Sequence, residues 1–163
     1  MIPELGNLAL ILALLLALAQ SILPLLGAWI GSRPLMAVAR PAAAGQAVFV
    51  AIAFCILAYS FITFDFSVAY VADNSNLALP WYYRIAAVWG AHEGSLLLWI
   101  LILNVWTVAL AMFSQRLPAD FAARVIGVLG LVAVGFLLFI ILTSNPFTRL
   151  LPMPTDGADL NPV

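Results

Sequence analysis

One stretch of the sequence, WGAHEGSLLLW at residues 89–99, contains the residue types that could do chemistry. It holds the only histidine, His92, beside Glu93, with glycines on both sides, at the start of a long apolar run. Such a histidine can ligate a metal or relay protons, because imidazole titrates near neutral pH. It can equally be a polar residue at the membrane interface. Glu93 could pair with His92 only through a turn, since neighbours on a helix point apart.

Three of the five tryptophans lie in or just after this stretch. Trp89, Trp99 and Trp106 would share a face with His92 if residues 89–106 formed one helix. Anchoring at the membrane surface explains Trp89 and Trp99. Trp106 would lie near mid-membrane, where its indole N–H needs a partner. It either packs against another helix or belongs to an aromatic wall suited to a planar macrocycle or a quinone.

Composition places the chain in a membrane. Of 163 residues, 66% are hydrophobic and 8% are charged, which a soluble domain of this size could not hide from water. All six basic residues are arginines that stand singly. The sequence therefore has no basic stripe for nucleic acid, which is excluded as a partner, and no polybasic cluster for an anionic lipid surface.

The hydrophobic runs predict an all-α integral membrane protein in which residues 1–163 form one four-helix module. We expect spans at about residues 5–26, 46–64, 95–113 and 121–142, each close to the roughly 20 residues that cross a bilayer. Loops are expected at 65–94 and 143–163 on one side, with a short aqueous connection at 28–45 on the other. Ala123, Gly127, Gly130 and Gly135 predict that the fourth helix packs closely against a neighbour.

The apolar run from Ile85 to Phe113 is too long for one span. As a helix it would measure about 43 Å, against a hydrocarbon core of ~30 Å. We therefore expect a short interfacial segment at residues 82–93 and a joint at Gly94. The loop before it ends in residues typical of the headgroup belt. The candidates for contact with a partner are Trp81, Tyr82, Tyr83, Arg84 and Glu93.

The arginines predict the orientation. The loops after the first and third spans hold four of them, Arg33, Arg40, Arg116 and Arg124, whereas the other side holds two, mixed with aspartates. Cytoplasmic loops are enriched in arginine. We therefore expect the N-terminus, the 65–84 loop and His92 on the periplasmic side.

Seven segments, in this order, resemble the N-terminal part of the CcmF family. They are ELGN (4–7), DFSVAYVADNSN (65–76), LPWYYR (79–84), WGAHEGSLLLW (89–99), FSQRLP (113–118), TSNPF (143–147) and DLNP (159–162). The resemblance runs essentially from end to end. It implies the large membrane subunit of the cytochrome c haem lyase, in the bacterial inner membrane or, alternatively, the mitochondrial inner membrane.

The resemblance also implies a cofactor and partners. In this family haem arrives on the chaperone CcmE and is attached to the Cys-x-x-Cys-His motif of apocytochrome c, with CcmH and CcmI as partners. The family is several hundred residues longer, and its tryptophan-rich haem platform and haem-ligating histidines would follow residue 163. The resemblance therefore gives His92 no ligand role.

Together these observations predict the N-terminal section of a haem-lyase subunit that helps bind haem and attach it to apocytochrome c on the periplasmic side. It would pack against membrane lipid and the remaining part of the same subunit. We expect no catalysis from it alone, and predict no catalytic residue or metal site. His92, Trp89, Trp99 and Trp106 are the haem-adjacent candidates. The alternative is a transporter or quinone-linked energy-coupling subunit, with a polar pathway through His92, Glu93 and Asn104.

Overall fold

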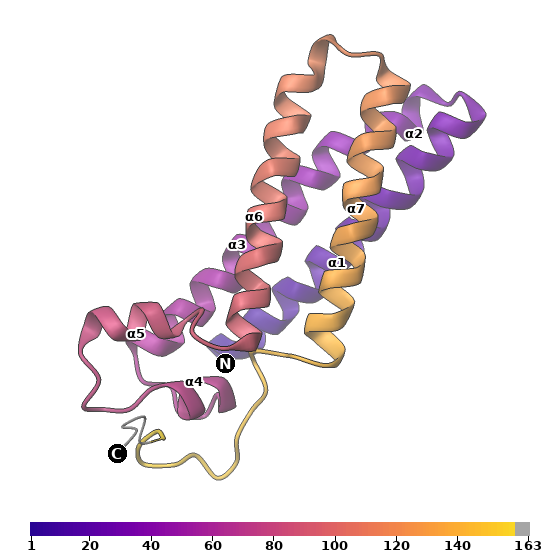
Figure 1. Ribbon diagram of the computed structural model, residues 1–163. Helices are drawn as coiled ribbons and strands as arrows, with labels where there is room; N and C mark the ends of the chain where they lie inside the picture. The colour runs from indigo at the N-terminus through magenta and orange to yellow at the C-terminus, as the bar shows by residue number, and fades with distance from the viewer. Residues whose placement is uncertain (159–163) are drawn as a thin grey trace.

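Long helices account for most of the chain and stand side by side (Figure 1). The structure is a computed structural model, and it describes residues 1–158 apart from the side chain of Gln115. The elements are α1 (Ile2–Ile30), α2 (Arg33–Ala37), α3 (Ala39–Ile62), α4 (Ala69–Asn74), α5 (Trp81–Ala87), α6 (His92–Phe113), the 3₁₀ turn η1 (Ser114–Arg116) and α7 (Ala119–Leu142). Four helical stretches, Ile2–Ile30, Arg33–Ile62, His92–Phe113 and Ala119–Leu142, are long and apolar enough to cross a membrane. The predicted all-α class with four spans is confirmed.

α1 is the centre of the packing. It lies along both α3 and α7, and α6 closes the bundle by packing against the same two helices. Ala9, Ala13 and Ala17 recur every four residues on α1 and are almost completely buried, which lets neighbouring backbones approach closely. A Cβ added at Gly130 of α7 would lie 3.0 Å from a backbone nitrogen of α1. The predicted close packing of the fourth helix is confirmed at this position but not at Gly135, where an added Cβ meets no atom within 4 Å.

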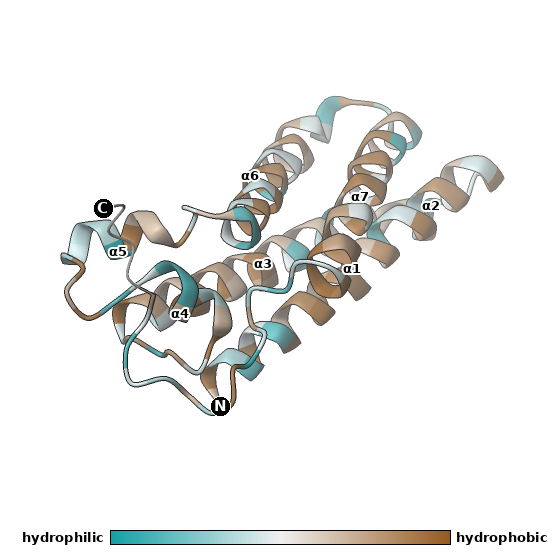
Figure 2. Ribbon diagram, turned by 60° about the horizontal axis from the view of Figure 1, so that its bottom comes forward, coloured by the Kyte–Doolittle hydropathy of each residue, from teal (hydrophilic) through white to brown (hydrophobic). Residues whose placement is uncertain are grey.

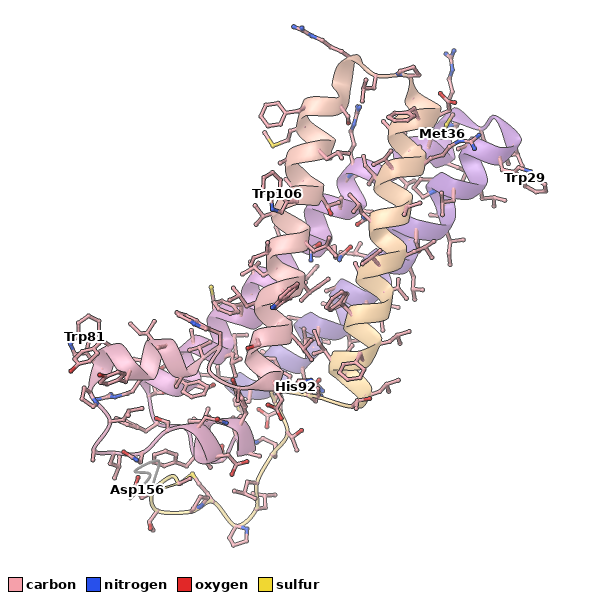
Figure 3. The ribbon with its side chains drawn as sticks, in the orientation of Figure 1. Trp29, Met36, Trp81, His92, Trp106 and Asp156 are labelled. Atoms are coloured by element: carbon pink, nitrogen blue, oxygen red, sulfur yellow. The ribbon has the colours of Figure 1, made fainter. Side chains whose placement is uncertain are left out.

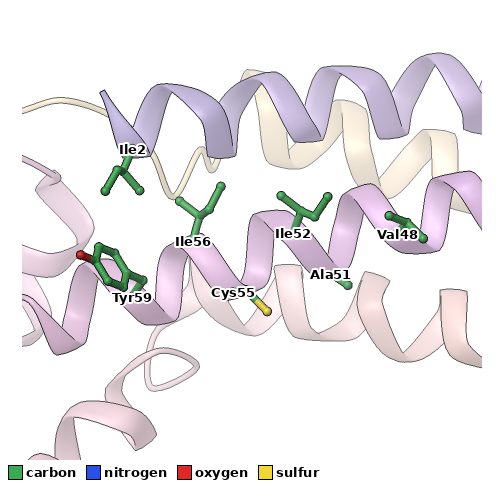
Figure 4. A pocket seen from close by; sticks show the side chains of 7 residues that line it. All are labelled: Ile2, Val48, Ala51, Ile52, Cys55, Ile56 and Tyr59. Atoms are coloured by element: carbon green, nitrogen blue, oxygen red, sulfur yellow. The ribbon is translucent and has the colours of Figure 1, made fainter.

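The outward faces of the bundle are apolar. Figure 2 shows hydrophobic colours along the long helices and hydrophilic colours mainly near their ends and on the short helices. A shallow pocket of about 550 Å³ lies on the outer face of α3 beside the start of α1 (Figure 4). It is lined by Ile2, Val48, Ala51, Ile52, Cys55, Ile56 and Tyr59. The bundle therefore presents an apolar surface to its surroundings, as a membrane helix does.

The connection after the first span is more helical than predicted. α1 runs through Pro24 and ends only at Gly31, which adopts the left-handed conformation with φ 74°. α3 begins at Ala39, because its alanine-rich first turns favour helix and Pro41 is tolerated there. Residues 28–45, which were expected to be a short connection, are therefore mostly helical.

The joint before the third span also differs from the prediction. α5 ends at Ala87, a tight turn follows, and α6 starts at His92 rather than Ser95. Gly94 lies inside α6 and is not the joint. A Cβ at Gly94 would lie 1.7 Å from the carbonyl oxygen of Val88. Glycine is required there because the preceding turn lies directly against the helix.

Candidate functional site

Three stretches far apart in the sequence meet at the end of the bundle where α1 begins. We call this region the cap and define it as residues 1–7, 63–91 and 143–158 (Figure 1). The backbones of residues 67–69 and 148–150 pair, with Ala69 N–H donating to Thr148 O at 2.9 Å. Asn145 Nδ2 donates to Asn7 Oδ1 at 3.0 Å. The cap is therefore held by direct contacts among all three stretches.

Arg149 is the charged centre of the cap. Its Nε lies 3.2 Å from Oε1 of Glu4 on α1, and its Nη1 lies 3.8 Å from Oδ2 of Asp65. The same Nη1 donates to the Ser67 hydroxyl, which in turn donates to Asp65. One guanidinium thus joins the start of α1, the loop after α3 and the stretch after α7, as suits a planar group with five donors.

Tyr70 on α4 holds the turn between α5 and α6. Its hydroxyl donates to Val88 O at 3.2 Å and accepts a hydrogen bond from Ala91 N–H at 3.3 Å. A Cβ at Gly94 would lie 2.6 Å from the same hydroxyl. Gly94 therefore leaves room for both the turn and the phenol, and these two residues position the start of α6.

The environment keeps Tyr70 protonated. Burial raises the pKa of the Tyr70 hydroxyl above its ordinary value of 10.0, and the nearby charge of Glu93 raises it further. Hydrogen bonds with the backbone of Ala91 and Gly94 oppose this effect without reversing it. The phenol therefore remains a hydrogen-bond donor throughout the physiological pH range.

His92 lies at the first position of α6, at the rim of the cap (Figure 3). Its Nδ1 shares a hydrogen bond of 2.7 Å with Oγ of Ser144, a residue just after α7. The imidazole tautomer sets which of the two groups donates. The ring also meets Phe139 edge-on, with 5.9 Å between the ring centroids. His92 therefore ties the start of α6 to the end of α7. Glu93 follows it on the helix and forms no hydrogen bond with it among residues 1–158.

His92 has one ring nitrogen that faces no described hydrogen-bond partner. The side chain is exposed, and within residues 1–158 its Nε2 has no hydrogen-bond partner. In a neutral imidazole this nitrogen has a free lone pair for a metal only in the tautomer in which Nδ1–H donates to Ser144 Oγ. Over the same described range, no group of three His, Cys, Asp or Glu side chains could hold a metal ion. A haem here would need further contacts from other residues.

The three tryptophans do not form one wall. Trp89 lies in the turn before α6, so the single helix over residues 89–106 that would align it with the others does not exist. Trp99 and Trp106 are on the outward side of α6, where they are 66% and 70% exposed, and Figure 3 shows Trp106 pointing away from the bundle. Their indoles are therefore available to lipid or to a neighbouring helix.

The aromatic residues of α5 point outward, whereas Arg84 on the same helix turns inward. Trp81, Tyr82 and Tyr83 are each more than half exposed. Arg84 Nε donates to Leu79 O at 2.8 Å, and its guanidinium carbon lies 4.1 Å from the ring centroid of Phe64. Three of the partner-facing candidates thus form an exposed aromatic row, while Arg84 fixes the helix that carries them.

Sequence reasoning missed the residues that organise the cap. Tyr70, Ser144 and Arg149 sit in loops or short helices, and hydrophobic periodicity says nothing about their partners. The seven segments that resemble the CcmF family could have pointed to this region, because five of them supply residues to the cap or to the start of α6. Segment 113–118 lies at the opposite end of the bundle, and 159–162 lies outside the described residues.

Asn104 is buried in α6, where its Nδ2 donates to Ile100 O of the same helix at 2.9 Å. Within residues 1–158 it makes no hydrogen bond with His92 or Glu93. Among the described residues, direct contacts therefore do not form the polar pathway of the alternative function.

Comparisons with known proteins agree with the resemblance of the segments. The family model described as "Cytochrome C assembly protein" matches residues 89–163. The cytochrome c-type biogenesis protein CcmF of Pseudomonas aeruginosa is 65% identical over 100% of this chain, and that of Escherichia coli is 54% identical over 100% of it. Each match covers 25% of the relative, so the chain spans a quarter of the length of these proteins.

A solved structure described as "Cytochrome c Heme Lyase CcmF" has the same arrangement of helices. It superposes with a TM-score of 0.86 at 31% identity, over 92% of this chain and 25% of that one. Sequence and fold thus point to the same relatives over nearly the whole chain. The chain belongs to the CcmF family of cytochrome c biogenesis proteins and matches the N-terminal part of its members.

Proposed function

We propose that this chain is the section of a haem-lyase subunit that builds the periplasmic rim on which haem is joined to apocytochrome c. The observation that carries the proposal is the cap. Family segments that are separate in the sequence meet there, around His92 and the exposed aromatic row. The reaction itself, and haem as its substrate, require the remaining part of the subunit.

The charge distribution supports a periplasmic cap. Four arginines, Arg33, Arg40, Arg116 and Arg124, lie toward the opposite end of the bundle, in or near the starts of α2, α3 and α7 and in η1. The cap and its rim carry two arginines, Arg84 and Arg149, among five acidic residues, Glu4, Asp65, Asp73, Glu93 and Asp156. Arginine-rich ends stay in the cytoplasm. A reporter fused after Asn76 in the loop between α4 and α5 is expected to be active in the periplasm. Activity only in the cytoplasm would invert the orientation.

Two surfaces supply the contacts that the function needs. The exposed row of Trp81, Tyr82 and Tyr83 suits a protein partner, because aromatic residues are enriched at the centres of interfaces. We assign it to the haem chaperone CcmE, the apocytochrome or the CcmH and CcmI subunits. The outward face of α6, with Trp99 and Trp106, is assigned to the remaining helices of the same subunit and to lipid.

Haem would supply the iron and the vinyl groups that become thioether bonds, and the residues here would bind and orient it. Exposed His92 Nε2 and neighbouring Trp89 are the groups that could touch its edge. The hydrogen bond to Ser144 fixes the plane of the imidazole, which is how partners of a ligand usually act. Trp106 is assigned to packing and not to haem.

The test of the function is genetic and optical. Removing residues 1–163 from the subunit in its own organism should abolish covalent haem staining of c-type cytochromes. The subunit co-expressed with its operon and purified should show a Soret band. Cytochromes that mature normally without this segment, together with a purified assembly that holds no haem, would contradict the haem-lyase function.

A further inference from the structure

The fold gathers arginines that the sequence scatters. Figure 3 shows basic side chains at the end of the bundle opposite the cap. Arg40 Nη2 donates to Ser114 O at 3.2 Å, and Arg124 Nη2 donates to Ala28 O at 3.2 Å. Ser114 follows the last residue of α6, and Ala28 lies in the last turn of α1. Each guanidinium thus binds a carbonyl group at the C-terminal end of a helix, where positive charge is favoured. The fold also brings Arg33 and Arg40, which stand singly in the sequence, to the lining of one pocket.

A pocket of about 260 Å³ opens among these arginines, between α2, α3 and the start of α7. Arg33 and Arg40 line it, together with Ala119 at the first position of α7. Its floor is apolar and buried, formed by Ala39, Ala122, Ala123 and Ile126. Pockets for whole drug-sized ligands measure roughly 300–1,000 Å³, so this smaller pocket suits a single small headgroup.

The pocket has an excess of positive charge. Within residues 1–158, neither Arg33 nor Arg40 forms an ion pair. The only acidic residue in segments 27–47 and 108–130 is Asp120, which does not line the pocket. α7 adds the positive end of its dipole, because Pro118 provides no side-chain cap and the first intrahelical bond is Ala122 N–H to Pro118 O. Asp120 in the first turn of α7 offsets part of this charge, and the two arginines leave an excess of positive charge that favours an anion.

The surroundings select a lipid as the source of that anion. The pocket lies at the ends of membrane-spanning helices, and large apolar residues at the same end are exposed, namely Trp29, Phe113, Leu117 and Phe121. Such residues mark the level of the headgroups. An anion at this depth is most simply the phosphate of a lipid, with its acyl chains along the apolar outer faces. Basic pockets between membrane helices are known to hold anionic headgroups.

We propose that this pocket, lined by Arg33, Arg40 and the first turn of α7, binds the phosphate of an anionic phospholipid headgroup. Both arginines contact the phosphate, and the free N–H groups at Ala119 face it. The pocket fixes one lipid at the end of the bundle where α2, α3 and α7 meet.

The test is lipid binding by the full chain in detergent, measured by native mass spectrometry during titration with phosphatidylglycerol. One basic residue near a charged lipid surface contributes ~1 kcal/mol, which is about fivefold in affinity. Arg33→Gln should therefore weaken binding about fivefold, and the Arg33→Gln/Arg40→Gln pair more than tenfold. Phosphatidylcholine, which is zwitterionic, should bind weakly to all three chains.

Two further variants separate a site from general charge and from misfolding. Ala119→Glu adds an anion at the rim and favours the helix start, so it should keep the fold and lower phosphatidylglycerol binding as strongly as Arg33→Gln. Arg116→Gln removes a charge at the same end outside the pocket and should have little effect. Equal losses from Arg116→Gln and Arg33→Gln, or unchanged binding in Ala119→Glu and the double variant, would overturn the proposal. Saturation of the pocket by inorganic phosphate without any binding of the lipid would overturn the lipid assignment.

Discussion

Gly94 and Tyr70 act together as one joint. The glycine leaves space that the carbonyl of Val88 and the phenol occupy, and the phenol bonds both sides of the turn. No periodicity in the sequence predicts this arrangement, because Gly94 looks like a helix breaker and Tyr70 like an interfacial aromatic. The prediction of a joint near residue 94 was close in position but wrong in kind, since the glycine serves packing rather than bending.

Gly94→Ala should destabilise the folded chain by about 1–3 kcal/mol, because the added Cβ would clash with backbone that cannot move cheaply. The measurement is the unfolding midpoint in detergent, followed by tryptophan fluorescence. Gly135→Ala is the matched control, since an added Cβ there meets no atom within 4 Å. Equal midpoints for the two variants would show that the turn does not rest on Gly94.

Tyr70→Phe should cost about 1 kcal/mol, since it leaves the part-buried Ala91 N–H without its acceptor. The cost should depend on pH. The folded pKa of Tyr70 is raised, so its stabilising contribution is complete below pH 10.0, the ordinary value, and is lost as the pH rises from there through the folded pKa. The difference in unfolding free energy between wild type and Tyr70→Phe should therefore shrink above pH 10. A difference in unfolding free energy that stays constant above pH 10 would mean that the folded chain does not raise the pKa of Tyr70.

His92→Ala in the full-length subunit should lower the yield of holocytochrome c more than Trp106→Phe does. Loss of one oriented contact of ~1 kcal/mol corresponds to about fivefold. Haem staining of membranes gives the yield, and immunoblotting gives the subunit level. Ser144→Ala separates the orientation of the imidazole from its contact, because the variant removes the hydrogen bond that orients His92 but leaves His92 in place. It should therefore give an intermediate loss of holocytochrome c. Wild-type yields from both His92→Ala and Trp106→Phe would leave His92 an interfacial residue.

At the scale of elements, hydrophobic runs predicted the long helices well and their ends poorly. The four spans are present, but α1 continues past Pro24 because a membrane helix tolerates proline. α3 begins early because alanines outweigh Arg40 and Pro41. The short helices α4 and α5 have no strong hydrophobic periodicity in the sequence. Tertiary contacts made by Tyr70 and Arg84 determine where these helices lie. Local propensity therefore identifies spans, and long-range contacts set their limits.

The pairing of residues 67–69 with 148–150 depends on Arg149, which joins three elements. Arg149→Met should loosen the stretch after α7 and increase its cleavage by added protease several-fold, while global unfolding shifts by about 1 kcal/mol or less, as expected for a partly exposed ion pair. Limited proteolysis with mass mapping locates the cuts. Arg116→Met, at the opposite end, should leave the cleavage pattern unchanged. Identical patterns in both variants would contradict a role of Arg149 in holding the cap.

At the scale of the whole molecule, the two ends of the bundle differ in chemistry. The cap gathers acidic residues, His92 and the aromatic row, whereas the other end gathers arginines around a pocket. Composition predicted the membrane and the family segments predicted the relatives. The meeting of those segments in the cap could not be predicted, because it rests on contacts such as Asn7 with Asn145 across 138 positions of sequence separation.

The most direct measurement is a chimera in which these 163 residues replace the matching quarter of the Pseudomonas aeruginosa relative, expressed in a strain that lacks that protein. Since the two are 65% identical over the whole chain, the cap should form on the foreign helices. The account predicts that haem-stained c-type cytochromes return to near the level given by the native gene. A chimera that reaches the membrane in normal amount but restores no covalent haem would contradict it.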